Sequence, residues 1–97
     1  MKEVKNVDKL ARYMTKANLS RCFGVSLPTV SRRVKGIEEE IKRGRYTRYA
    51  IADNLICIPV FLDYAKYQKR LNDKNLRRTV PDFDDHAAME YLVEVRE

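Results

Sequence analysis

Hydrogen-bonding and cationic side chains cluster between Ser26 and Lys35, in the run Ser-Leu-Pro-Thr-Val-Ser-Arg-Arg-Val-Lys. Val30 and Val34 are four residues apart in this run, so they share one face of a helix. The face opposite the valines then carries Pro28, Thr29, Ser31, Arg32 and Lys35. Hydroxyl and guanidinium groups in such a row can bind phosphate oxygens and base edges, and an arginine can donate two hydrogen bonds to a guanine. We therefore expect this segment to bind DNA.

Each side chain of the run has an expected role. Ser26 is suited to cap the helix and Pro28 to stand in its first turn, where free N–H groups point toward any nearby phosphate. Thr29 and Ser31 are expected to contact phosphates or base edges, and Arg32 to contact a guanine. Arg33 and Lys35 are better placed for phosphates, although Arg33 falls where such helices often carry an apolar residue.

A helix-turn-helix over roughly Thr15 to Lys35 must position these residues. Thr15 can cap a first helix over residues 16–23, and Gly24 supplies the tight turn. Packing is expected through Leu19, Phe23, Val25, Val30 and Val34, with Leu27 also turned inward. The second helix would then stand outward and could enter a major groove. An ordinary helical hairpin with an exposed cationic face is the competing interpretation.

The rest of the chain predicts a mainly helical fold. We expect an amphipathic helix over residues 4–14. The second helix of the helix-turn-helix is expected to end or weaken at Gly36. Further helical turns are expected over residues 37–43, with Glu38, Glu39 and Glu40 outward. A β-hairpin is expected with strands near 46–51 and 55–58 around Asp53-Asn54. A helix of about 12 residues should start at Pro59, and a last one should run from Asp84 or Asp85 to about Val95. Residues 1–72 would form the DNA-binding domain, and residues 73–97 a basic linker with an acidic C-terminal helix or tail.

Charge is distributed unevenly along the 97 residues. Residues 1–80 hold 19 lysines and arginines against 8 acidic residues, whereas residues 81–97 hold 6 acidic residues and one arginine. A basic body of this kind suits a polyanion, because each phosphate contact releases a condensed counterion. There is no apolar run long enough for a membrane span and no signal-peptide pattern, so we expect a cytoplasmic protein without membrane contact.

Catalytic and metal-binding chemistry is not expected. The only histidine, His86, lies beside Asp82, Asp84 and Asp85, which are more simply explained as acidic residues opening a helix. Cys22 and Cys57 are expected to be reduced and buried. With three glycines there is no phosphate-binding loop. We expect neither an enzyme nor a cofactor.

Three stretches together resemble phage excisionases and their MerR-like winged-helix relatives. They are Phe-Gly-Val-Ser-Leu-Pro-Thr-Val-Ser-Arg-Arg-Val at 23–34, Gly-Arg-Tyr-Thr-Arg-Tyr-Ala-Ile at 44–51 and Ile-Pro-Val-Phe-Leu-Asp-Tyr at 58–64, within a similarity over about residues 13–71. The resemblance implies a winged helix-turn-helix whose basic hairpin, the wing, touches DNA through Arg45 and Arg48. Tyr46 and Tyr49 are either further wing contacts or packing residues. The insertion at 37–43 and the acidic C-terminal segment depart from the family pattern.

The function implied is sequence-specific binding of double-stranded DNA for a phage or mobile element, in a bacterial host cell. The protein would act as an excisionase-like recombination directionality factor or as a transcriptional regulator, with an integrase or a second copy as a further partner. The alternative is a protein-interaction module that docks a host or phage protein through the helix at 60–71, with Phe61, Tyr64 and Tyr67, and through the acidic tail. RNA binding, with tyrosines stacking on bases, is a third interpretation.

Overall fold

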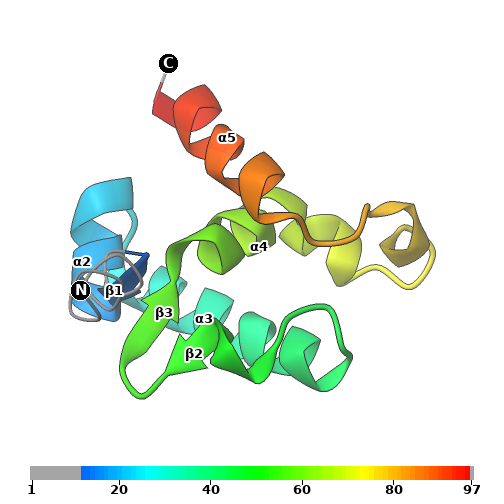
Figure 1. The fold of residues 1–97 in the computed structure, drawn as a ribbon, viewed down its shortest axis with the longest axis horizontal. Coiled ribbons are helices and arrows are strands. Elements are labelled where there is room, and N and C mark those ends of the chain that lie inside the picture. Colours follow the sequence, from blue (N-terminus) through cyan, green and yellow to red (C-terminus); the bar gives the residue numbers. More distant parts are fainter. Residues whose placement is uncertain (1–11, 97) are drawn as a thin grey trace, which may run out of the picture.

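The computed structural model describes residues 12–96, and the side chains of residues 12–90. In chain order it contains strand β1 (Tyr13–Thr15), helices α2 (Lys16–Phe23) and α3 (Leu27–Lys42), the 3-10 turn η1 (Arg48–Ala50), strands β2 (Ile51–Ala52) and β3 (Leu55–Cys57), helix α4 (Ile58–Leu71), the 3-10 turn η2 (Arg77–Thr79) and helix α5 (Asp85–Arg96). Figure 1 shows α3 and α4 running side by side, with the small sheet at one end and α5 leaving α4 at an angle. The expected class, mainly helical with a small β element, is confirmed.

The sheet is antiparallel and has the strand order β1-β3-β2. Tyr13 is opposite Cys57 in one pair, and Ile51 is opposite Ile56 in the other. The helix expected over residues 4–14 is therefore wrong at its end, because the backbone of residues 13–15 pairs with β3; its earlier part lies outside the described residues. Hydrophobic spacing suggested a helix there, but the pairing partner is more than 40 residues away in the sequence.

The hairpin turn lies at Asp53-Asn54, as predicted, and Asp53 adopts the left-handed conformation with φ 56° that Asp tolerates better than most residues. The expected strand over 46–51 is wrong for most of its length. Residues 48–50 form η1 instead, because the Thr47 side chain accepts a hydrogen bond from the backbone N–H of Tyr49 and closes a tight turn.

Local capping signals set the ends of α2 and the start of α3. The Thr15 hydroxyl accepts from the backbone N–H of Asn18 at 3.2 Å and starts α2. Gly24 ends this helix with φ 64°, a conformation that glycine adopts without strain. The Ser26 hydroxyl then accepts from the N–H of Thr29 and starts α3. These three expectations are confirmed.

α3 is longer than expected and runs without interruption through Gly36 to Lys42. Gly36 faces α4, and a Cβ atom built there would lie 2.0 Å from the hydroxyl oxygen of Tyr64. The expectation that Gly36 ends or weakens the helix is therefore wrong. The glycine is accounted for by the approach of the Tyr64 ring to the α3 backbone.

The core lies between α2, α3, α4 and the sheet. Its fully covered members are Leu19, Val30, Ile37, Ile56 and Phe61. Phe23 stacks on Phe61 with ring centroids 5.7 Å apart, which joins α2 to α4. Leu27 is 49% exposed, so its expected inward position is wrong; it lies at the first position of α3, ahead of the packed turns.

Two buried carboxylates connect distant segments. Glu40, 1% exposed, pairs with Arg77 and Arg43, and its expected outward position is wrong. Asp63, 4% exposed, accepts from Arg45 and from the Tyr46 hydroxyl. Glu40 is thus paired from η2 by Arg77, and Asp63 from the loop after α3 by Arg45 and Tyr46.

The region after α4 is attached to the body at several points. Arg70 donates to the carbonyl of Thr79, and the ring of Phe83 meets that of Tyr46 edge-on at 5.3 Å. The Asp84 side chain accepts from the N–H of His86 at 2.9 Å and so opens α5, as predicted. Ala88 of α5 is buried, and α5 lies against α4. Within residues 12–96, no helix is both long and apolar enough to cross a membrane.

Candidate nucleic-acid interface

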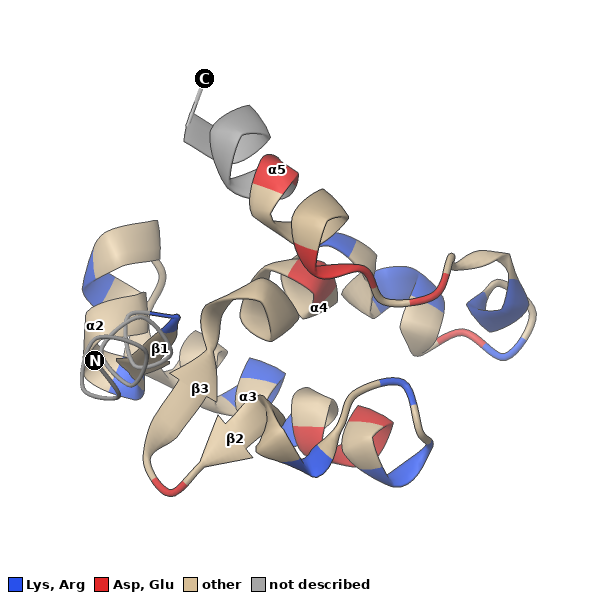
Figure 2. Ribbon diagram, in the orientation of Figure 1, with Lys and Arg blue, Asp and Glu red and all other residues tan. Residues whose placement is uncertain are grey.

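The N-terminal half of α3 presents most of the predicted binding residues to solvent. Ser26, Pro28, Arg32 and Lys35 are exposed, and Thr29 and Ser31 are partly exposed. α2 packs behind this half of α3, and Leu19 and Val30 belong to the same buried core. The Ser20 hydroxyl donates to the carbonyl of Val25 at 2.6 Å, which fixes the turn. Figure 2 shows basic residues on both helices of this pair. None of these six side chains is fully covered by the rest of the described chain.

A short hydrogen-bonded chain orients the first turns of α3. The hydroxyls of Ser26 and Thr29 lie 2.9 Å apart, and an Nη atom of Arg32 donates to the Thr29 hydroxyl at 3.1 Å. The guanidinium therefore lies along the helix toward its start and keeps further N–H donors for a ligand. Among the described residues, no carboxylate forms an ion pair with Arg32 or Lys35. Their charge is available to a polyanion.

The Arg33 side chain points toward α4, whereas those of Arg32 and Lys35 face solvent. Its guanidinium carbon lies 5.7 Å from the centre of the Phe61 ring, and its Nε is buried without a hydrogen-bond partner. Arg33 lines a pocket of about 450 Å³ beside α4, together with Thr29, Arg32, Tyr64, Gln68 and Asn72. The phosphate contact expected for Arg33 would have to be made from within this pocket, because its side chain lies on the α4 side of α3.

Gln68 and Asn72 are candidate binding residues that the sequence did not reveal. They place amide groups beside Arg32 and Arg33, and Asn72 also donates to the Tyr64 hydroxyl at 3.2 Å. The one feature of the sequence that could have pointed to them is Gln68 itself, an amide in the otherwise apolar face of the helix after Pro59. It could be interpreted only once the side of α4 that meets α3 was known.

Arg45 does not lie on an exposed wing, and that expectation is wrong. Its side chain is 9% exposed, donates to both oxygens of Asp63 at 3.0 and 3.1 Å, and donates to the carbonyl of Pro81 at 2.8 Å. Tyr46 is also buried, and its hydroxyl donates to Asp63 at 2.6 Å. Burial first and the Asp63 carboxylate second raise the pKa of Tyr46, so the phenol stays protonated.

Arg48 and Tyr49 remain available near the sheet. Arg48 is exposed on η1, its guanidinium lies 5.0 Å from the Tyr49 ring centre, and it donates to the Tyr49 hydroxyl at 3.0 Å. Tyr49 is 62% exposed, and its carbonyl accepts from the Tyr13 hydroxyl at 2.7 Å. The hairpin at 51–57 has no lysine or arginine. The positive charge of Arg48 therefore lies on η1 and not at the hairpin tip.

Other groups with possible chemistry are dispersed. Among the described residues, no three His, Cys, Asp or Glu side chains are grouped as a metal site would need. Both cysteines are free thiols. Cys22 is exposed, contrary to its expected burial, because it lies on the outer side of the short helix α2. Cys57 is half-buried, and burial raises the pKa of its thiol.

No family model matches this chain, and comparison with curated proteins and with solved structures gave no match either.

Proposed function

We propose that this protein binds double-stranded DNA sequence-specifically through a winged helix-turn-helix, with the N-terminal half of α3 in the major groove. The proposal rests above all on the capped, exposed start of α3, where Arg32 is held by Thr29 and has no acid partner in the described chain. In this arrangement Arg32 reads a guanine, Thr29 and Ser31 contact backbone or base edges, and Lys35 neutralises a phosphate.

The order of elements supports this proposal. A short helix, a glycine turn and α3 are followed by an antiparallel hairpin and then by α4, which completes the core. The excisionase and MerR-like proteins that the sequence resembles have the same succession. Arg48 would then contact the backbone next to the groove that α3 enters. We accordingly place the protein in a phage or mobile element, as a recombination directionality factor or transcriptional regulator that works with an integrase or a second copy.

The alternative of a docking helix at 60–71 has weak support. Phe61 is 1% and Tyr64 4% exposed, because both rings pack against α3. Of the three aromatic residues expected to form that docking surface, Tyr67 alone is partly exposed. A partner protein would therefore find few apolar side chains on this helix.

Fluorescence anisotropy with labelled duplexes tests the proposal. Selection of bound oligonucleotides from a random pool gives the preferred site, and titrations on that site and on random duplex give the specificity ratio. Arg32→Ala should weaken cognate binding by about 1–3 kcal/mol and relax the preference at one base pair. Lys35→Ala should weaken all duplexes alike and reduce the salt slope by about one.

Lys69→Ala is the matched control, because this exposed lysine of α4 carries the same charge outside the proposed interface. Its affinity for DNA should stay close to that of the unaltered protein. If Arg32→Ala and Lys69→Ala have equal effects, or if selection enriches no sequence, then α3 does not read bases and the proposal is refuted.

A further inference from the structure

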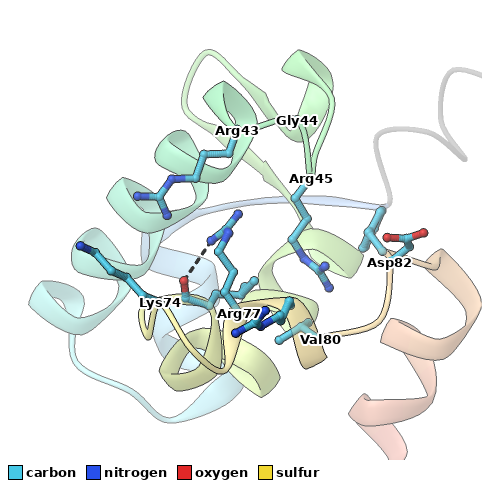
Figure 3. Close-up of a pocket in the computed structure, with 10 residues that line it drawn as sticks. Arg43, Gly44, Arg45, Lys74, Arg77, Val80 and Asp82 are labelled. Atoms are coloured by element: carbon cyan, nitrogen blue, oxygen red, sulfur yellow. Dashed lines mark hydrogen bonds between the residues drawn. The ribbon is translucent and has the colours of Figure 1, made fainter.

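A second concave surface, at the C-terminal end of α3, is lined by cations. It is a pocket of about 640 Å³ between the end of α3 and the segment after α4, and Figure 3 shows Arg45 and Arg77 entering it from opposite sides. Five basic residues line it: Arg43, Arg45, Lys74, Arg77 and Arg78. Asp82 is the one carboxylate among its lining residues.

Three of the five cations are held in place by buried carboxylates at the pocket wall. Glu40 accepts from Arg77 through both carboxylate oxygens and from Arg43 at 3.1 Å, and Arg77 also donates to the carbonyl of Leu71 at 2.9 Å. Asp63 holds Arg45 in the same way. Both carboxylates are buried, so these contacts fix the guanidinium groups at the pocket wall. A ligand would meet preorganised donors.

The other two cations have no such partner. No hydrogen bond or ion pair within the described chain involves the side chains of Lys74 and Arg78, and both residues are exposed. Five cations thus face three carboxylates, namely Glu40, Asp63 and Asp82, and the pocket carries an excess of positive charge. Uncompensated charge in a concavity favours an anion, because the field there is less screened than over a convex surface.

We propose that this pocket binds a phosphate group, with Lys74 and Arg78 closing on an anion that Arg77 and Arg43 help to orient. The planar fork of Arg78 matches the oxygens of a phosphate, and the volume accommodates a diphosphate. The N–H groups of Arg43 and Arg77 that Glu40 and Leu71 leave unbonded are further donors. The pocket is separate from the face of α3 that starts at Ser26: Arg32 and Arg43 are eleven residues apart, or about 16 Å along a helix. This inference does not depend on α3 reading DNA.

The phosphate has two possible sources, a free diphosphate or the backbone of a nucleic acid. Isothermal titration with inorganic pyrophosphate tests the site itself, using the full chain and the double variant Lys74→Ala/Arg78→Ala. The variant removes two exposed side chains that form no hydrogen bond or ion pair in the described chain, so circular dichroism should show an unchanged fold. We expect saturable binding by the unaltered protein and at least about tenfold weaker binding by the variant, since each charge-assisted contact contributes on that order.

Lys16→Ala/Lys69→Ala is the matched control, because it removes the same charge from exposed positions of α2 and α4. If it weakens pyrophosphate binding as much as the pocket variant does, or if pyrophosphate does not bind at all, the proposed site is refuted. Anisotropy with duplex DNA then identifies the source. If the pocket variant loses duplex affinity, and pyrophosphate competes with duplex for the unaltered protein, the site binds backbone phosphate. If the duplex affinity of the variant is unchanged, the site binds a free ligand.

Failure of this site and failure of the proposed function are distinguishable. A protein that binds pyrophosphate through Lys74 and Arg78 but shows no duplex binding would keep the pocket and lose the DNA-binding assignment. A protein that binds duplex through Arg32 but does not bind pyrophosphate, and whose duplex affinity is unchanged in the pocket variant, would keep the DNA-binding assignment and lose the pocket.

Discussion

Substituting Gly36 by alanine tests whether the contact between α3 and α4 fixes the position of α3. The new Cβ would lie 2.0 Å from the hydroxyl oxygen of Tyr64 and 2.3 Å from its Cζ. Unbonded heavy atoms need about 3.5 Å, so the ring would have to shift by more than 1 Å. Tyr64 is 4% exposed and packed in the core, and it cannot swing into solvent without moving α4.

Two opposing effects determine the magnitude. Alanine is a better helix former than glycine, which should stabilise the interior of α3 by about 1 kcal/mol. Overpacking typically costs about 1–3 kcal/mol, and a displaced Tyr64 would also lose the hydrogen bond from Asn72, about 1 kcal/mol more. We therefore expect Gly36→Ala to lower the free energy of unfolding by about 1–3 kcal/mol.

Urea unfolding followed by far-ultraviolet circular dichroism measures this change. The control is the same substitution in a Tyr64→Leu background, where the ring that would clash is gone. There Gly36→Ala should be neutral or stabilising by up to about 1 kcal/mol, because only its helix propensity remains. If Gly36→Ala stabilises the protein that retains Tyr64, the two helices do not meet at this residue, and the placement of α3 given above is incorrect.

Two further predictions concern stability. Burial raises the pKa of Glu40, but its contacts with Arg77 and Arg43 outweigh this and lower the pKa below 4.5, its ordinary value. Its stabilising effect is therefore complete above about pH 4.5 and is lost as the pH falls through the lowered value. Glu40→Gln should lack that acid dependence and be about 2 kcal/mol less stable at pH 7, measured by urea unfolding across pH; parallel acid profiles would contradict this. Thr15→Ala should cost about 1 kcal/mol by removing the cap of α2, whereas Thr15→Ser should retain most of the stability. Equal loss in both variants, compared by thermal unfolding, would show that the hydroxyl is not responsible.

The features that the sequence predicted correctly are those set by near neighbours in the chain. Thr15, Gly24 and Ser26 act within three or four residues, through a cap hydrogen bond or a backbone conformation, so their effects can be inferred from residue type. The turn at Asp53-Asn54 is local in the same sense. This is why the two helices α2 and α3, the turn between them and the exposure of Arg32 followed from the sequence.

The features that it missed depend on partners far along the chain. Glu40 is buried because Arg77, 37 residues later, pairs with it, and Gly36 is tolerated in a helix because Tyr64 lies over it. Arg45 was assigned to a wing from its neighbours in the sequence, but Asp63 draws it inward. A charged residue shows no sign in the sequence of whether it will be solvated or paired, and that choice decides whether it can bind a ligand.

The same pairing changes what the net charge implies about DNA binding. The excess of cations in residues 1–80 suggests many phosphate contacts, but Arg43, Arg45 and Arg77 are engaged by buried carboxylates, and Lys42 by Glu39. On the side of α3 and η1, the exposed cations without an acid partner in the described chain include Arg32, Lys35 and Arg48. Arg32 is assigned to a base. If Lys35 and Arg48 supply most of the phosphate contacts, the slope of log affinity against log salt should be near −2, since each contact contributes about −0.9. A much steeper slope would mean that DNA also reaches the cations of the pocket at the end of α3, and the pocket variant should then flatten it.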